Sequence, residues 1–218
     1  MPRILMLHGY SQNDIVFRKR TAVLRKDLET LGMELGPEDD LRGWWLANAE
    51  KTAQIGYKES VHFLKNAWIE KGPFDGIIGF SQGAALAPLF VTELAFAATT
   101  GDMNSYILPK FMILVSGFVS IAVTALADAP IPEGELSANS GVLDLWPEGR
   151  VQIPALHVIG QGDAWVVPRE SHGLVARFAE ATSLVAEHEG GHYIPTNADM
   201  RVRFKEYVAS QLAGTAPK

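Results

Sequence analysis

The sequence predicts an α/β fold with a mostly parallel central sheet and helices on both of its faces. Short apolar runs alternate along the 218 residues with longer segments of helical spacing, which is typical of this class. The apolar runs are largely uninterrupted, as buried strands are. No repeat, low-complexity tract or linker divides the chain. We therefore expect a single domain over residues 1–218.

The first third of the chain gives one clear strand and two helices. RILML at 3–7 reads as a buried strand, and 14–31 as an amphipathic helix that ends near Gly32. Residues 33–46 are interpreted as a short or degraded strand followed by a loop. A second helix is predicted over about 47–70, with one face formed by Tyr57, Val61, Leu64 and Trp68.

The rest of the chain continues the alternation and adds one irregular segment. The predicted strands are 74–80, 111–118, 154–160 and 182–190, and the predicted helices are 82–98 and about 198–213. Residues 99–110 read as a polar loop. The proline-containing, acidic stretch at about 121–150 falls outside the alternation, so it is interpreted as a small lid-like insertion.

The composition of the chain excludes several classes of function. The net charge of −6, with no cluster of Lys and Arg, argues against a nucleic-acid partner or an anionic membrane surface. The absence of cysteine excludes a disulfide scaffold, a cysteine nucleophile and thiolate metal sites. The apolar run at the N-terminus is too short for a signal peptide, and no stretch reaches a membrane span, so we expect a cytoplasmic protein.

The stretch GFSQG at 79–83 is the strongest motif. It lies between a predicted strand and a predicted helix, where a sharp reversal places Ser81 at its apex. Side chains two positions before or after the serine would clash in such a turn, which accounts for Gly79 and Gly83. Ser81 is therefore the candidate nucleophile, against the alternative of a small residue in a glycine-rich turn.

A serine needs a base, and the chain offers six histidines. His192 follows the last predicted strand and two glycines that can turn its loop toward Ser81, so we take it over His188, which reads as a strand-end residue. His157 is interpreted as a satisfied core residue in the middle of a strand, and His8 as a residue that pins its loop.

The base needs a carboxylate to orient it. Asp163 lies just beyond the strand at 154–160, where α/β folds place active groups. Asp144 is the competing candidate, but it lies in the proline-containing insertion. The loop LHGYSQN after the first strand is the last part of the predicted catalytic site. The backbone N–H groups of Tyr10 and Gln82 are the predicted oxyanion hole.

These motifs together resemble the FSH-type serine hydrolases of the α/β-hydrolase superfamily. The matching stretches are ILMLHGYSQN, FRKRTAVLRKDL, RGWW, FDGIIGFSQGAALA, HVIGQGDAWVVP and GGHYIP, which span nearly the whole chain. Acyl-protein thioesterase-like carboxylesterases share GFSQGA but usually read HGLGD near the start. Relatives usually have a strand ending in Asp-Ala-Pro before the tryptophan pair, whereas this chain has GMELGPEDD, so part of the acyl-pocket wall is expected to differ.

The resemblance implies an α/β-hydrolase fold and a serine esterase or thioesterase that uses Ser81, Asp163 and His192 without metal or cofactor. The implied substrate is a small-molecule ester or an acyl-thioester, free or bound to a carrier protein. Trp165 and Trp146 are candidates to line the acyl pocket, with ordinary packing as the equal alternative. The competing functions are an acyl-protein thioesterase-like carboxylesterase and a non-catalytic hydrolase-like binding module.

Overall fold

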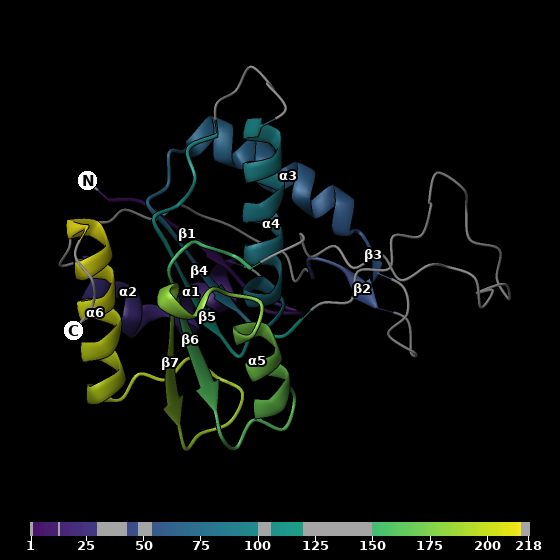
Figure 1. Cartoon of the computed structure of the whole chain (residues 1–218). Helices are drawn as coiled ribbons and strands as arrows, with labels where there is room; N and C mark the ends of the chain where they lie inside the picture. The colour runs from purple at the N-terminus through teal and green to yellow at the C-terminus, as the bar shows by residue number, and fades with distance from the viewer. Residues whose placement is uncertain are drawn as a thin grey trace, which may run out of the picture.

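The central sheet of the computed structural model has five parallel strands (Figure 1). The structure describes residues 2–12, 14–29, 43–47, 54–99, 106–119 and 150–214. In spatial order the strands are β1 (Ile4–Leu7), β4 (Gly76–Phe80), β5 (Phe111–Val115), β6 (Ala155–Gly160) and β7 (Ser183–His188). This arrangement confirms the predicted fold class. Because all the strands run the same way, the residues that follow them lie along one edge of the sheet.

Successive residues of the central strands contribute to two separate hydrophobic layers. In β5, Met112 and Leu114 belong to one layer, while Phe111, Ile113 and Val115 belong to the other. The first layer is covered by α3 (Tyr57–Lys71), α4 (Gln82–Thr99) and α5 (Pro168–Val175). The second is covered by α1 (Asp14–Arg20), α2 (Ala22–Glu29) and α6 (Ala198–Ala213). Helices therefore cover both faces, as predicted (Figure 1).

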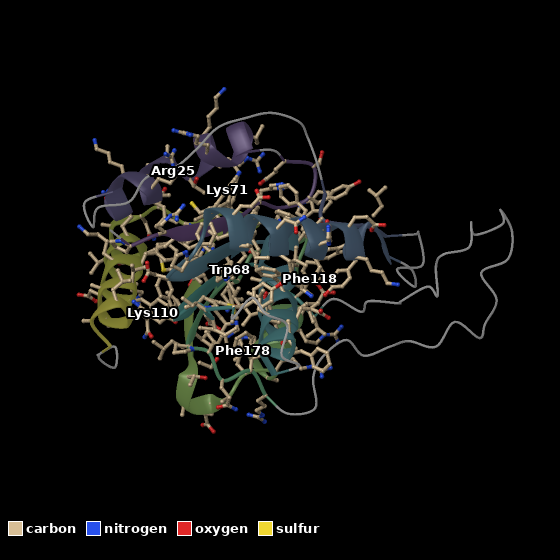
Figure 2. All side chains as sticks on the ribbon, turned by 90° about the horizontal axis from the view of Figure 1, so that it is seen from above. Arg25, Trp68, Lys71, Lys110, Phe118 and Phe178 are labelled. Atoms are coloured by element: carbon tan, nitrogen blue, oxygen red, sulfur yellow. The ribbon has the colours of Figure 1, made fainter. Side chains whose placement is uncertain are left out.

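Side chains fill the space between the sheet and the helices. Figure 2 shows this packing from above, with Trp68 and Phe178 labelled within the first layer. Trp68 packs edge-on against Phe90, with ring centroids 5.6 Å apart, and its indole N–H donates to the Ile107 carbonyl. The buried aromatic thus satisfies its one polar group.

The helix predicted over 14–31 is divided at Thr21, between α1 and α2. The Thr21 hydroxyl donates to the Phe17 carbonyl at 2.7 Å, alongside the backbone N–H of the same residue at 2.9 Å. A threonine that bonds back to the preceding turn commonly bends a helix, so the prediction was right about the helical segment and missed the break.

The predicted start of the second helix, at about residue 47, was wrong. β2 (Leu46–Ala47) instead pairs in antiparallel fashion with β3 (Gln54–Ile55), and α3 begins only at Tyr57. Gly56 sits between them in the left-handed region with φ of 91°. A left-handed residue at this point stops any helical turn from extending backward.

The last helix is fixed by its caps and by one ion pair. The Asn197 side chain accepts from the Met200 N–H at the start of α6, and Gly214 ends the helix in the left-handed region with φ of 68°. Arg201 forms a two-pronged ion pair with Asp27 of α2, at 2.6 and 2.7 Å. Hydrogen bonding to Arg201 lowers the pKa of the Asp27 carboxyl.

Some predictions fall on residues that are not described. The insertion at about 121–150 lies outside the described residues except for Arg150, and Asp144 and Trp146 lie there with it. Among the helices that the structure describes, none has the length and apolar character to cross a bilayer.

His157 in β6 is buried, as predicted, but it is not satisfied. Its ring meets the Phe178 ring edge-on at 4.7 Å, and its Nε2 has no hydrogen-bond partner among the described residues. Burial, with a smaller contribution from the charge of His172, lowers the pKa of His157 to about 4. The folded protein therefore holds this imidazole neutral at pH values where an unfolded histidine takes up a proton.

Replacing His157 should make the fold less sensitive to acid. Between pH 6.5 and 4 the unfolded chain binds a proton here that the folded chain does not, so the free energy of unfolding falls as the pH falls. The slope reaches about 1.4 kcal/mol per pH unit. Urea unfolding at pH 7.5 and pH 5 should show a smaller acid loss for His157→Leu than for the unaltered protein. His62→Gln, at an exposed histidine on α3, should leave that loss unchanged; an equal loss in both variants would contradict the assignment.

Candidate active site

Four residues of the predicted site, and Ser116 in addition, lie along the carboxyl edge of the sheet. Tyr10 follows β1, Ser81 follows β4, Ser116 follows β5, Asp163 follows β6 and His192 follows β7. Parallel strand order brings these five positions together although the sequence spreads them over most of the chain.

Ser81 occupies a strained backbone position between β4 and α4. Its φ of 54° is unusual for a residue with a side chain. Its N–H donates to the Val115 carbonyl at 2.9 Å, and its carbonyl accepts from Ala85 at 3.0 Å as the helix begins. The chain therefore changes from strand to helix at Ser81 itself.

The two glycines of the motif are required by close backbone packing. A Cβ on Gly79 would lie 2.5 Å from the Gly83 carbonyl oxygen. A Cβ on Gly83 would lie 2.2 Å from the Leu7 carbonyl oxygen and 2.7 Å from that of His8. All of these atoms are backbone and cannot move aside, so the clash inferred from the sequence has a definite structural basis.

The structure brings Ser81, His192 and Asp163 into one hydrogen-bonded chain. His192 Nε2 lies 3.0 Å from Ser81 Oγ, and His192 Nδ1 lies 2.8 Å from Asp163 Oδ2. A carboxylate can only accept, so the neutral imidazole carries its proton on Nδ1. Nε2 is then free to accept the proton of the serine hydroxyl.

Asp163 is held as a carboxylate despite its burial. Desolvation acts to raise its pKa, but the net shift is downward because donors surround it. The backbone N–H groups of Trp165 and Val166 both donate to Oδ1 at 2.9 Å, and His192 donates to Oδ2. A lowered pKa keeps the charge that an imidazolium next to it requires.

Ser116 adds to the surroundings of Asp163 and was not predicted as a site residue. It is 1% exposed and has a φ of 49°. Its hydroxyl lies close enough to the Asp163 carboxylate to lower the pKa of that group, although Oγ makes no hydrogen bond of standard geometry to a described residue. The sequence prediction placed Ser116 inside the strand at 111–118, whereas β5 ends at Val115, so the position just beyond a strand, which identified Asp163, was not recognised here.

The loops that carry Asp163 and His192 are bonded to each other beyond the ends of their strands. Gln161 N–H donates to the His188 carbonyl at 2.8 Å, and Gly162 N–H to the Gly190 carbonyl at 3.0 Å. A Cβ on Gly160 would lie 2.7 Å from the carbonyl oxygens of both Gly190 and Gly191. These backbone contacts therefore fix the positions of Asp163 and His192 relative to each other.

The other histidines near the edge lie apart from this chain of hydrogen bonds. His188 is the last residue of β7, as predicted, and its Nδ1 accepts from Gly190 N–H at 3.2 Å. Burial lowers the pKa of His188 and outweighs the opposing charge of Asp163. His8 Nδ1 lies 2.8 Å from the Gly9 carbonyl, consistent with the prediction that it pins its loop.

The two predicted oxyanion residues flank the serine. Gln82 is the first residue of α4, where a backbone N–H has no carbonyl partner one turn earlier in the helix and the helix dipole favours negative charge. Tyr10 lies after β1, next to Gly9, where an added Cβ would lie 3.0 Å from the Phe80 ring and 3.2 Å from Ser81 Cβ. Trp165, two residues after Asp163, is 82% exposed.

No group of three or more metal-ligating side chains is found within the described ranges.

A five-stranded parallel sheet with helices on both faces and a serine at a strained strand-to-helix turn defines the α/β-hydrolase class. Within it, the chain belongs to the family described as serine hydrolase (FSH1), whose model matches residues 1–36 and 33–204. The family suggested by the sequence motifs is thereby confirmed.

Curated relatives extend over nearly the whole chain. Esterase OVCA2 of Bos taurus is 34% identical over 94% of this chain and 95% of its own length. Esterase CG5412 of Drosophila melanogaster is 31% identical over 96% of this chain and 74% of its own. The predicted enzyme class, a serine esterase, is confirmed by this family and these relatives.

Solved structures agree with the fold. SOBER1 of Arabidopsis thaliana superposes with a TM-score of 0.59 at 17% identity, covering 97% of this chain and 99% of its own. Acyl-protein thioesterase 2 of Zea mays gives 0.54 at 18% identity, covering 97% and 94%. At identities of 17% and 18%, the similarity to these structures shows the fold alone.

Gly83→Ala should disrupt the turn at Ser81. The added methyl group would have to displace the β1 backbone, so we expect a loss of stability of about 1–3 kcal/mol and at least a tenfold loss of ester hydrolysis. Gly173→Ala on α5 is the matched control, since its Cβ would meet nothing nearer than 3.9 Å. Thermal melting and p-nitrophenyl acetate turnover measure both effects. A Gly83→Ala protein with unchanged melting and turnover would refute the packing argument.

Proposed function

We propose that the protein hydrolyses carboxylic esters through an acyl-enzyme on Ser81, with His192 as general base and acid and Asp163 as its orienting carboxylate. The observation that carries this proposal is the pair of hydrogen-bond distances, 3.0 Å from Ser81 to His192 and 2.8 Å from His192 to Asp163. Nucleophile, base and orienting acid at these separations can act without rearrangement.

In the first half-reaction Ser81 Oγ attacks the acyl carbon while its proton passes to His192 Nε2. The backbone N–H groups of Tyr10 and Gln82 stabilise the oxyanion, and the buried Asp163 carboxylate stabilises the imidazolium. The tetrahedral intermediate then collapses. The bond to the leaving oxygen or sulfur breaks, and His192 returns its proton to the departing alcohol or thiol.

In the second half-reaction water replaces the leaving group. His192 takes a proton from water as its oxygen attacks the acyl-enzyme, and the resulting intermediate expels Ser81, which regains its proton from His192. The products are the carboxylic acid and the free enzyme. Every step uses side chains and backbone of this chain, so the mechanism needs no cofactor.

The substrate is proposed to be a small-molecule ester, with an acyl-thioester as the second candidate class. Curated relatives in the same family carry the name esterase, which favours the oxygen ester. A thioester, free or bound to a carrier protein, would use the same residues, because only the leaving atom changes. A non-catalytic binding module is the remaining alternative, and it would have no need of the Ser81–His192 contact.

Ser81→Ala should abolish turnover and leave the fold intact. Loss of the nucleophile in such enzymes lowers kcat on the order of 10⁴- to 10⁶-fold. Ser171→Ala is the matched control, because it removes a buried serine hydroxyl that donates to the Gly117 carbonyl, at 2.8 Å. Both variants and the unaltered protein would be assayed on p-nitrophenyl esters and acyl-thioesters of increasing chain length.

The outcomes of that assay separate the candidates. A higher kcat/KM for oxygen esters than for matched thioesters supports the esterase, and the reverse order supports a thioesterase. Equal, slow turnover by all three proteins, together with no labelling of Ser81 by a fluorophosphonate, would contradict the hydrolase and support the non-catalytic binding module.

Trp165 is proposed to line the path of the acyl group. Its backbone is fixed by the bond to Asp163, while its indole is 82% exposed beside the site. Trp165→Ala should raise KM for long-chain or aromatic esters several-fold, with a smaller effect on kcat. Phe63→Ala, at a 62% exposed aromatic on α3, serves as the control. Equal KM values for Trp165→Ala and the unaltered protein at every chain length would remove Trp165 from the site.

A further inference from the structure

The tryptophan pair at residues 44 and 45 contacts both halves of the proposed oxyanion hole. Trp44 N–H donates to Gln82 Oε1 at 3.0 Å, and Gln82 Nε2 donates to the Trp45 carbonyl at 2.9 Å. The buried side-chain amide of Gln82 thus accepts one backbone hydrogen bond from this segment and donates another to it, as the backbone of a neighbouring strand would. Gln82 is the residue whose backbone N–H begins α4 directly after Ser81.

The same segment holds the loop after β1. Trp44 Nε1–H donates to the His8 carbonyl at 2.8 Å, and the indole stacks on the His8 ring with centroids 4.8 Å apart and planes 25° apart. Gly43 lies so close that a Cβ there would be 2.7 Å from the Tyr10 ring. One short stretch of chain therefore touches the residues that carry both proposed donors.

The loop needs such support more than the helix does. The N–H of Gln82 is fixed in direction by the helix that it begins. The N–H of Tyr10 lies in a loop, where Gly9 N–H donates to Gln12 Oε1 at 3.2 Å and His8 Nδ1 lies against the Gly9 carbonyl. The bond from Trp44 to the His8 carbonyl connects this loop to the Gln82 amide, and through it to the turn at Ser81.

We propose that Trp44 and the side chain of Gln82 are positioning residues that set the separation of the two oxyanion N–H donors. The inference rests on the proposed function. Glutamine suits this task because its amide both accepts from Trp44 N–H and donates to the Trp45 carbonyl. Ser60 of α3 completes the support by donating its hydroxyl to the Trp44 carbonyl.

The test compares two tryptophans that each donate to a backbone carbonyl. Trp44→Phe removes the bond to His8 and keeps an aromatic ring against the His8 imidazole. Trp68→Phe removes the corresponding 3.1 Å bond to Ile107, a residue that precedes β5 and so lies toward the amino ends of the parallel strands. The two changes are alike in chemistry and differ in distance from the site.

Loss of an oxyanion donor lowers kcat by about 10²–10³-fold, so loosening one should cost roughly tenfold. We expect Trp44→Phe to lower kcat by about that factor with KM nearly unchanged, and to weaken binding of a trifluoromethyl ketone transition-state analogue in proportion. Trp68→Phe should leave kcat unchanged at a comparable loss of melting temperature.

Gln82→Glu is the second variant, and it decides the matter if Trp44→Phe does not fold. It keeps the length of the side chain but replaces the donor to the Trp45 carbonyl with an acceptor, so kcat should again fall with KM nearly unchanged. Equal kcat in the two phenylalanine variants, or a loss confined to KM, would overturn the proposal. If Ser81→Ala retains full turnover, the proposed function fails instead, so the two failures are distinguishable.

Discussion

The reversal of the chain at Ser81 is the constraint on which the rest of the site depends. With φ of 54°, Ser81 is held in a backbone conformation that few non-glycine residues adopt. What holds it is the contact of Gly79 and Gly83 with backbone atoms of β1, the turn and α4, together with the bond from Ser81 N–H to the Val115 carbonyl. The neighbouring strands β1, β4 and β5 therefore fix the position of Ser81. The other side chains of the site have to lie within hydrogen-bonding distance of it.

The parallel order of the sheet explains why these side chains lie close to Ser81. Asp163, His192, Ser81 and the loop that carries Tyr10 each follow a different strand, and parallel order places all of them at one edge. Burial and hydrogen bonding then determine which of the buried side chains carry a charge. Desolvation acts against the charge on Asp163, but two backbone N–H groups and an imidazole N–H restore it. His157, buried without such donors or acceptors at Nε2, stays neutral instead.

Most of the architecture could be predicted because apolar runs and their breaks are local in sequence. All five sheet strands fall where the apolar runs lie, and the glycine spacing around Ser81 identified the turn. The start of α3 was missed because the β2–β3 pairing is a contact between segments, which helical periodicity does not reveal. For the same reason the sequence pointed to the backbone of Gln82 but not to its side chain, whose partners Trp44 and Trp45 are distant in sequence. Ser116 was missed because the predicted strand, 111–118, included it, whereas β5 ends at Val115, and its nearness to Asp163 depends on the register of β5 and β6.

The bonding between the loops after β6 and β7 joins the segments that carry Asp163 and His192 into one part of the site. Gly162 bonds Gly190, and the backbone at Gly160 packs on Gly190 and Gly191, so the aspartate and the histidine are carried by one rigid unit. The serine belongs to a second unit, formed by the turn and its strands. In protein engineering, Asp163 and His192 would therefore have to be transplanted together, as a two-loop module.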